Sequence, residues 1–140
     1  MSLRYPPTWQ ARNCEADQSF RPRIFIGTSD QPPCNAQDTA FRILIVEFPS
    51  DTPAGRQPGA YVGTVRSTEN VIVRGVNGTR TTAEVTDSNP LPPPKGTVQT
   101  IYRFTTNGRT FVLYYDREPG AIDVTTDFDL MVKWTLMFSS

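Results

Sequence analysis

The sequence predicts an α+β domain in which helices pack on one antiparallel sheet. Two observations indicate this class. Two Asn-Gly dipeptides each lie between strand-like runs, as they do in β-hairpins, and a helical spacing of apolar residues is clear only near the carboxyl end. The chain has 140 residues, the size of one domain. A domain of this size buries about two-thirds of its extended surface, enough for a hydrophobic core.

The first strands are predicted at residues 21–27 and 41–48. Residues 21–27 form a short run that ends at a glycine, and residues 28–40 form a polar loop. Residues 41–48 read Phe-Arg-Ile-Leu-Ile-Val-Glu-Phe and precede Pro49. A nearly continuous apolar and β-branched run of this length is typical of a strand buried on both faces.

Residues 53–70 carry no clear period. Proline and several glycines weaken a helix here. The segment is therefore ambiguous, and a short helix over about 57–66 with Tyr61, Val62 and Val65 facing inward is one interpretation.

Two hairpins are predicted in the second half of the chain. The first pairs residues 71–76 with 79–85 across Asn77-Gly78, and the second pairs 99–105 with 110–115 across Asn107-Gly108. Asn-Gly accepts the positive φ angles of a type I′ turn, whose twist matches that of the strands. Residues 77–79 also match the N-glycosylation sequon, but a hairpin turn explains the dipeptide without glycosylation.

A proline-rich segment connects the two hairpins. Its prolines cannot donate to a sheet, so it is predicted to be a stiff extended loop of polyproline II type. Such a loop loses little entropy on binding, which makes it a candidate contact surface; the alternative is a rigid connector. The residues of this candidate contact loop are Pro90, Leu91, Pro92, Pro93, Pro94 and Lys95.

The carboxyl end predicts a turn at 116–120, a helix over 123–134 and a terminal strand over 134–138. Phe128, Met131 and Val132 recur at i, i+3 and i+4, the spacing of a buried helix face. Asp123 or Thr125 is expected to cap the helix, and the alternation after residue 134 favours a strand.

Charge and composition exclude several functions. Lysine plus arginine and aspartate plus glutamate each number 14, so the chain lacks the basic excess that non-specific nucleic-acid binding requires. No apolar run approaches the roughly 20 residues of a transmembrane helix. Histidine is absent, which removes the usual Ser-His and Cys-His catalytic pairs and the commonest metal ligand. With no phosphate-binding glycine loop either, we expect no catalytic residues, no cofactor and no enzyme activity.

Five carboxylates lie within residues 116–129, around the last turn and helix. Oxygen ligands of this kind suit a hard cation such as Ca²⁺ or Mn²⁺. A metal site formed by Asp123, Asp127 and Asp129 is therefore one hypothesis, and a metal-dependent hydrolase would follow from it. The spacing matches no EF-hand, and the alternative is acidic residues that complement the helix dipole.

Two cysteines, Cys14 and Cys34, lie in polar, turn-rich sequence rather than among aliphatic residues. We predict a disulfide between them, which would indicate an oxidising, extracytoplasmic compartment. Two unrelated free thiols are the alternative. Residues 1–3 are expected to be a short vector remnant that replaced an export segment, with a lipid anchor in the full-length protein.

Four segments, taken in order, resemble the PsbP-like domains, which comprise extrinsic photosystem II subunits and bacterial relatives that are often lipoproteins. Residues 5–9 are similar to a Pro-x-x-Trp motif, and residues 76–80 resemble a central glycine-containing hairpin. Residues 102–113 resemble the hairpin Y-x-F-x-x-x-G-R-x-Y-x-L, and residues 128–138 the helix-to-strand motif F-D-x-M-x-x-S-F-x-F, although its serine is missing here. All four are fold motifs of turn and core residues.

The resemblance implies a single domain over residues 4–140, with a sheet of about six strands sandwiched by helices. The first hypothesis is a non-enzymatic binding or accessory domain, held on the outer face of a bacterial membrane, whose partner is an unidentified protein or small ligand. A metal-dependent hydrolase using residues 116–129 and a photosystem-associated structural subunit are the alternatives. Fold alone does not decide among them.

Overall fold

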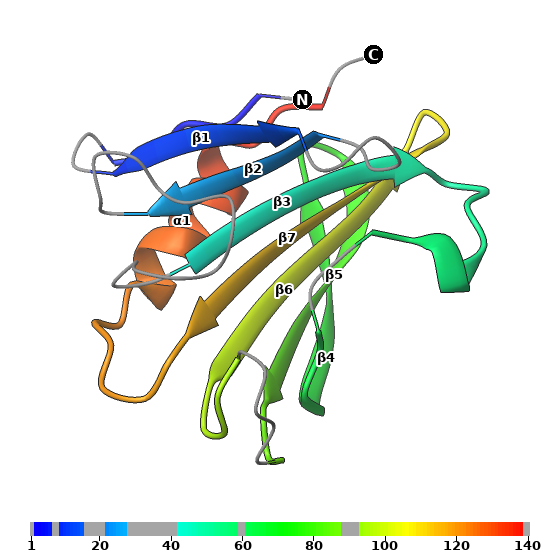
Figure 1. Ribbon diagram of the computed structural model, residues 1–140. Helices are drawn as coiled ribbons and strands as arrows, with labels where there is room; N and C mark the ends of the chain where they lie inside the picture. Colours follow the sequence, from blue (N-terminus) through cyan, green and yellow to red (C-terminus); the bar gives the residue numbers. More distant parts are fainter. Residues whose placement is uncertain are drawn as a thin grey trace.

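The described residues form a twisted antiparallel sheet, and an α-helix lies against one of its faces (Figure 1). The computed structural model describes residues 2–6, 9–15, 22–27, 42–58, 61–87 and 93–138, with the backbone alone for 10–15, 22–27 and 42. Its strands are β1 (Gln10–Glu15), β2 (Pro22–Gly27), β3 (Arg42–Pro49), β4 (Thr64–Val73), β5 (Val76–Glu84), β6 (Val98–Thr106) and β7 (Arg109–Arg117). The α-helix, α1, spans Thr125–Thr135, and a 3-10 turn, η1, spans Ala54–Arg56.

The seven strands follow the order β1-β2-β3-β7-β6-β5-β4, and every neighbouring pair is antiparallel. The predicted strand at 41–48 is confirmed as β3, which lies inside the sheet between β2 and β7. Four successive side chains of β3, Ile43 to Val46, are all buried. Its continuous apolar run is explained because both of its faces are covered.

The main core lies between the sheet and α1. Phe128, Met131 and Val132 of α1 are buried as predicted, and they meet aromatic side chains of β6 and β7. This cluster contains Trp9, Ile43, Ile45, Val73, Tyr102, Phe104, Leu113, Tyr115, Val124, Phe128, Met131, Val132 and Leu136. A smaller cluster on the opposite face contains Leu44, Val46, Phe48, Ile101, Val112 and Tyr114.

A buried amide on that opposite face holds the segment that leads into β4. The Gln99 side chain is fully buried, and its Nε2 donates to the Tyr61 carbonyl at 2.7 Å and to Asp116 Oδ1 at 3.1 Å. Its Oε1 accepts from the Gly63 backbone N–H at 2.7 Å. The side chain therefore supplies the hydrogen bonds that a further strand would otherwise supply to these backbone groups.

The first hairpin exists, but its predicted turn at Asn77-Gly78 is wrong. β4 and β5 turn at Arg74 and Gly75, with φ angles of 52° and 76°, and Asn77-Gly78 lies inside β5. A Cβ on Gly78 would clash with the Phe104 ring and lie 2.5 Å from the Arg103 carbonyl oxygen. Gly78 is therefore needed for the close approach of β6, not for a turn.

The second hairpin is confirmed. β6 and β7 pair across Asn107 and Gly108, whose φ angles of 51° and 71° suit a type I′ turn. The strand predicted at 21–27 is also confirmed, as β2.

The helix interpretation of residues 57–66 is wrong. β4 begins at Thr64, and Tyr61, Val62 and Val65 are exposed rather than buried. Pro58 and the β-branched residues Thr64 and Val65 disfavour a helix, and pairing with β5 fixes the extended conformation.

The terminal strand expected over 134–138 is also wrong. α1 continues to Thr135, and beyond it Met137 forms only an isolated bridge with Ser2. Leu136 is buried and Phe138 packs on Phe104. The alternating apolar residues therefore belong to an extended tail that covers the core, not to a strand of the sheet. Figure 1 accordingly shows the amino-terminal segment beside the carboxyl-terminal one.

The antiparallel α+β class is confirmed, whereas the expected sheet of about six strands has seven. The additional strand is β1, whose polar sequence gives no apolar alternation. The expected sandwich of helices is not confirmed, since α1 is the one α-helix in the described ranges and covers one face. No helix within these ranges is long and apolar enough to cross a membrane.

Candidate functional site

The structure separates the carboxylates that were considered as metal ligands. Asp116 points to the face opposite α1, where Gln99 donates to it. Asp123 precedes α1 and accepts hydrogen bonds from the backbone N–H and hydroxyl of Thr125, at 2.9 and 2.6 Å. These bonds lower the pKa of Asp123. The cap expected at Asp123 or Thr125 is wrong, because Val124 occupies the N-cap position and no side chain caps it.

Asp129, on the side of α1 that faces the sheet, forms an ion pair with Arg80 of β5. Arg80 donates from Nε and Nη2 to the two carboxylate oxygens, both at 3.0 Å, and the Tyr102 hydroxyl donates to Oδ1 at 2.5 Å. Glu69 lies 3.6 Å from Arg80 Nη1 on the exposed side. The hydrogen bonds that Arg80 donates to Asp129 raise the pKa of Arg80. Burial, followed by the bond to Asp129, raises the pKa of Tyr102. This arrangement ties α1 to β5 and β6.

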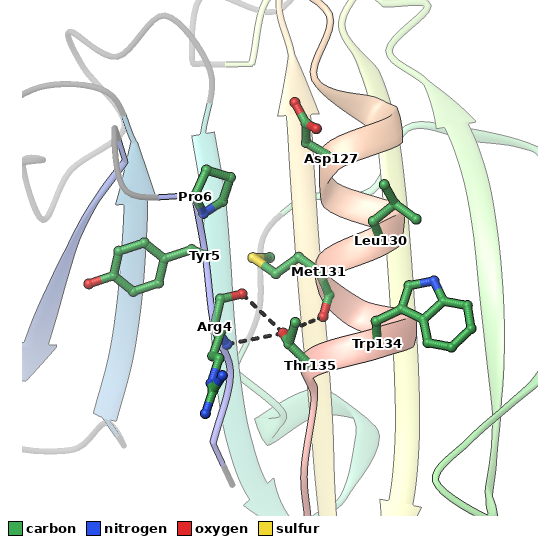
Figure 2. A pocket seen from close by; sticks show the side chains of 8 residues that line it. All are labelled: Arg4, Tyr5, Pro6, Asp127, Leu130, Met131, Trp134 and Thr135. Carbon is green, nitrogen blue, oxygen red and sulfur yellow. Dashed lines mark hydrogen bonds between the residues drawn. The ribbon is translucent and has the colours of Figure 1, made fainter.

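Asp123, Asp127 and Asp129 therefore do not converge. Over the described part of the chain, no group of three or more Cys, Asp or Glu side chains is placed to hold a metal ion. Asp127 lines a cavity that is mostly apolar (Figure 2).

This cavity is a groove between α1 and the amino-terminal segment. It has a volume of about 320 Å³, and we call it the α1 groove. It is lined by Arg4, Tyr5, Pro6, Asp127, Leu130, Met131, Trp134 and Thr135. Figure 2 shows Asp127 near the start of the helix and Arg4 beside Thr135 near its end.

Hydrogen bonds fix the amino-terminal wall of the groove. The Thr135 hydroxyl accepts from the Arg4 backbone N–H at 3.0 Å, and the same oxygen lies 3.0 Å from the Arg4 carbonyl and 2.6 Å from the Met131 carbonyl. Ser2 and Met137 exchange two backbone bonds of 2.8 Å, and Leu3 packs on the core. Residues 2–6 are thus part of the fold, whatever the origin of residues 1–3.

The groove is bordered by large apolar side chains that remain in contact with water. Trp134 is 70% exposed, Leu130 49% and Tyr5 40%, whereas Met131 at the floor is buried. An exposed tryptophan beside a hollow is unusual for a surface without a binding role. Leu130 and Trp134 are spaced i and i+4, beside the buried face at 128, 131 and 132. The sequence analysis placed Trp134 where the predicted helix ends and the predicted strand begins, and the i and i+4 spacing was the signal that could have placed Leu130 and Trp134 on one helix face.

The structure describes only part of the candidate contact loop over residues 90–95. Of the candidate contact loop, the described residues are Pro93, which is buried, and Pro94 and Lys95, which are exposed. They help connect β5 to β6, and Gly96 bonds to the Val85 carbonyl. Pro90, Leu91 and Pro92 lie outside the described residues, so a contact role for the loop stays a prediction.

The predicted disulfide is likewise untested. Cys14 lies on β1, where the backbone alone is described, and Cys34 lies outside the described residues.

Comparisons with known proteins bear on the fold. No protein-family model and no curated protein matches the chain. Among solved structures, the solution structure of cyanobacterial PsbP (CyanoP) from Synechocystis matches with a TM-score of 0.60 and 10% identity over 97% of this chain and 85% of that one. A 1.50 Å crystal structure from Bacteroides thetaiotaomicron matches with a TM-score of 0.55 and 12% identity. The match covers 99% of this chain but 44% of the Bacteroides chain.

The likeness to CyanoP agrees with the four sequence segments that resemble PsbP-like domains. Several residues of those segments meet in the structure: Tyr102 and Phe104 from one segment pack with Phe128 and Phe138 from another. At this level of identity the comparisons bear on architecture and not on activity. This chain has a PsbP-like fold.

Proposed function

We propose that this chain is a non-enzymatic binding or accessory domain that works outside the cytoplasm and binds another protein through the α1 groove. The observation that carries the proposal is the exposed apolar border of the groove, above all Trp134. Covering most of an exposed indole removes on the order of 100 Å² from water, which stabilises a complex by about 3 kcal/mol. Tryptophan is also among the residues that most often dominate protein interfaces.

The assignments of the carboxylates support binding rather than catalysis. Asp129 is neutralised by Arg80, and Asp123 is engaged by Thr125. A pair of carboxylates for acid–base work needs to converge on a substrate, with the pKa of one member raised. Asp127, which faces the groove, has an apolar floor beside it instead of a second carboxylate.

The extracytoplasmic location is proposed from the predicted Cys14–Cys34 disulfide and from the lipoproteins among PsbP-like domains. A lipid tether on the outer face of a membrane would leave the α1 groove facing partners in that compartment. The structural likeness to CyanoP also keeps a photosystem-associated subunit as the second candidate. The identity of the bound protein separates the two.

Photo-crosslinking in the natural host tests the proposal. A benzoylphenylalanine residue is introduced at Leu130, which lines the groove, or at Lys133, which is exposed on the same helix but does not line it. We expect one discrete crosslinked protein from position 130 and none from position 133. Equal crosslinking at the two positions would contradict the assignment of the groove.

The crosslinked protein, once purified, provides a quantitative test. Its affinity for the chain is measured by calorimetry with wild type and with Trp134→Ala. We expect a loss of at least about tenfold, as is usual for a central tryptophan. An unchanged affinity would overturn the proposal. A photosystem component as the partner would favour the second candidate.

A further inference from the structure

The strand β4 forms one edge of the sheet and is largely exposed. In the described part of the chain it stands last in the strand order and pairs with β5 alone (Figure 1). At ten residues it is the longest of the described strands, and residues 64–70 are all exposed. Ile72, near its end, is 71% exposed. The backbone groups along such an edge form a template for the addition of another strand.

The usual protections of a sheet edge are sparse on β4. Soluble proteins protect edges with proline, lysine, short strands or bulges. β4 contains neither proline nor lysine, and its register shifts once, between Val65 and Ser67, where a β-bulge interrupts the pairing with β5. The bulge at one end and the turn after Val73 at the other limit the regular edge to residues 67–73.

The turn that joins β4 to β5 decides which backbone groups of β4 point outward. Its φ angles of 52° and 76° suit a two-residue type I′ turn, so the closing pair, Val73 and Val76, is a hydrogen-bonded pair. Hydrogen-bonded and non-hydrogen-bonded pairs alternate along antiparallel strands. The backbone N–H and C=O groups of Thr68, Asn70 and Ile72 therefore point away from β5.

One register lets a second copy of β4 use the whole regular edge. Asn70 is the centre of residues 67–73, so a twofold axis at Asn70 places each end of this stretch opposite the other end of the second copy. Thr68 then lies opposite Ile72 of the second copy, and three hydrogen-bonded pairs add about six backbone hydrogen bonds. The contact between these two β-branched side chains also covers Ile72, the most exposed apolar side chain of the strand.

The neighbouring registers are less favourable. An axis at Glu69 would place the two Glu69 carboxylates directly opposite each other, and like charges in that position are destabilising. An axis at Thr68 would pair the regular edge of each copy with the bulge of the other, which interrupts the ladder. The axis at Asn70 avoids the bulge and offsets the two carboxylates, each of which lies 3.6 Å from Arg80 of its own chain. The edge is thus complementary to itself, which favours a second copy over an unrelated strand.

We propose that β4 pairs with β4 of a second copy of this chain, antiparallel and centred on Asn70, so that the two sheets become one. The contact consists mainly of backbone hydrogen bonds and few apolar side chains, so the dimer is weak and forms reversibly as the protein concentration rises. It uses none of the residues that line the α1 groove, and it is therefore independent of the proposed function.

Sedimentation over a range of protein concentrations tests the dimer. Asn70→Pro removes the outward N–H at the centre of the contact, and by symmetry it removes two of the new hydrogen bonds. Proline is tolerated on an edge strand where the N–H faces solvent, so the bonds to β5 are kept. We expect the association constant to fall at least about tenfold. The matched control, Asn70→Ala, keeps the N–H and is expected to associate like wild type.

Paired charges test the register. In the double variant Thr68→Lys with Ile72→Lys, each new lysine lies opposite a lysine of the second copy. In Thr68→Glu with Ile72→Lys, each lysine lies opposite a glutamate, and we expect at least about fivefold stronger association than in the first double variant. Asp51→Asn with Glu118→Gln changes the net charge as much as the first double variant does, at exposed positions outside β4, and is expected to leave the dimer unchanged.

Three results would overturn the proposal. The first is a wild-type chain that stays monomeric up to millimolar concentration, and the second is equal association of the two charge variants at residues 68 and 72. The third is a dimer that persists in Asn70→Pro and is lost in Trp134→Ala, which would place the contact at the α1 groove. Urea unfolding checks that each variant is folded, and the charge variants decide the outcome if Asn70→Pro does not fold.

Discussion

The Tyr102 hydroxyl on β6 donates a 2.5 Å hydrogen bond to Asp129 on α1. This contact joins two segments that resemble PsbP-like motifs, since Tyr102 begins one and Asp129 follows Phe128 in the other. Arg80 on β5 completes the arrangement with a bidentate ion pair, and its guanidinium lies 5.9 Å from the centre of the Tyr102 ring. Residues of both motifs thus fasten the helix to the sheet, which explains their pattern without any catalytic role.

Replacing Tyr102 by phenylalanine tests the strength of this fastening. The variant Tyr102→Phe keeps the ring contacts with Phe104 and Phe128 but removes the bond to a charged acceptor. A hydrogen bond to a charged group contributes about 1.5–3 kcal/mol, so we expect the free energy of unfolding to fall by about 2 kcal/mol in urea titrations. Tyr61→Phe, at an exposed tyrosine, is the control, with a change below about 0.5 kcal/mol. Equal changes in the two variants would show that the hydroxyl contributes nothing.

Alkaline pH should weaken the fold through the buried tyrosines. Burial raises the pKa of Tyr102 and Tyr115 above the ordinary value of 10.0, and the bond to Asp129 adds to the shift of Tyr102. The folded state therefore keeps protons that the unfolded chain releases. This contribution to stability is fully present below pH 10 and is lost as the pH rises toward the folded-state pKa.

The expected result is a fall in the free energy of unfolding, measured in urea, as the pH rises above about 10. The fall should be smaller in Tyr102→Phe, which lacks one of the two groups. A decline that is equally steep in wild type and in this variant would show that Tyr102 does not contribute to it.

How far the sequence predicted the fold depends on where the decisive contacts lie. The second hairpin followed from Asn107-Gly108 because a two-residue turn is decided locally. The first hairpin did not, because Gly78 is required by Phe104, which lies 26 positions along the chain and on another strand. The edge strand β1 carries no apolar alternation.

The candidate site was predictable in part for the same reason. The buried face of α1 followed from apolar spacing, and Leu130 and Trp134 lay within the same period. The groove itself depends on the amino-terminal segment. Thr135, near the opposite end of the chain, holds this segment beside the helix through its hydroxyl contacts with the Arg4 backbone. No local pattern indicates a contact of that kind.

The close approach at Gly78 predicts a large effect of a small substitution. In Gly78→Ala the new methyl group would meet the Phe104 ring and the Arg103 carbonyl, so β5 and β6 must separate locally. Overpacking of this kind costs about 1–3 kcal/mol in the free energy of unfolding. Gly55→Ala is the control, because its methyl group meets nothing within 4 Å. A change in Gly78→Ala no greater than in the control would favour the turn that the sequence predicted.

Titration calorimetry with Ca²⁺ and Mn²⁺ tests the metal hypothesis directly. Because Arg80 and Tyr102 already satisfy Asp129, a cation would have to displace a bidentate ion pair. We expect no heat of binding from either ion with the wild-type chain. Heat that disappears in Asp127→Asn but persists in the control Asp87→Asn would instead establish a cation site at the start of α1.

The predicted disulfide between Cys14 and Cys34 is tested by counting thiols. Denatured, non-reduced protein should show no free thiol by mass spectrometry after alkylation, and reduction should release two. Opening the bond is expected to lower the free energy of unfolding by about 3 kcal/mol, because the unfolded chain regains the entropy of an open loop. Cys14→Ser and Cys34→Ser should then be equally destabilised, and the double variant should be no worse than either, since all three lack the same bond. Two alkylated thiols in the non-reduced protein would exclude the disulfide and remove the main support for an extracytoplasmic location.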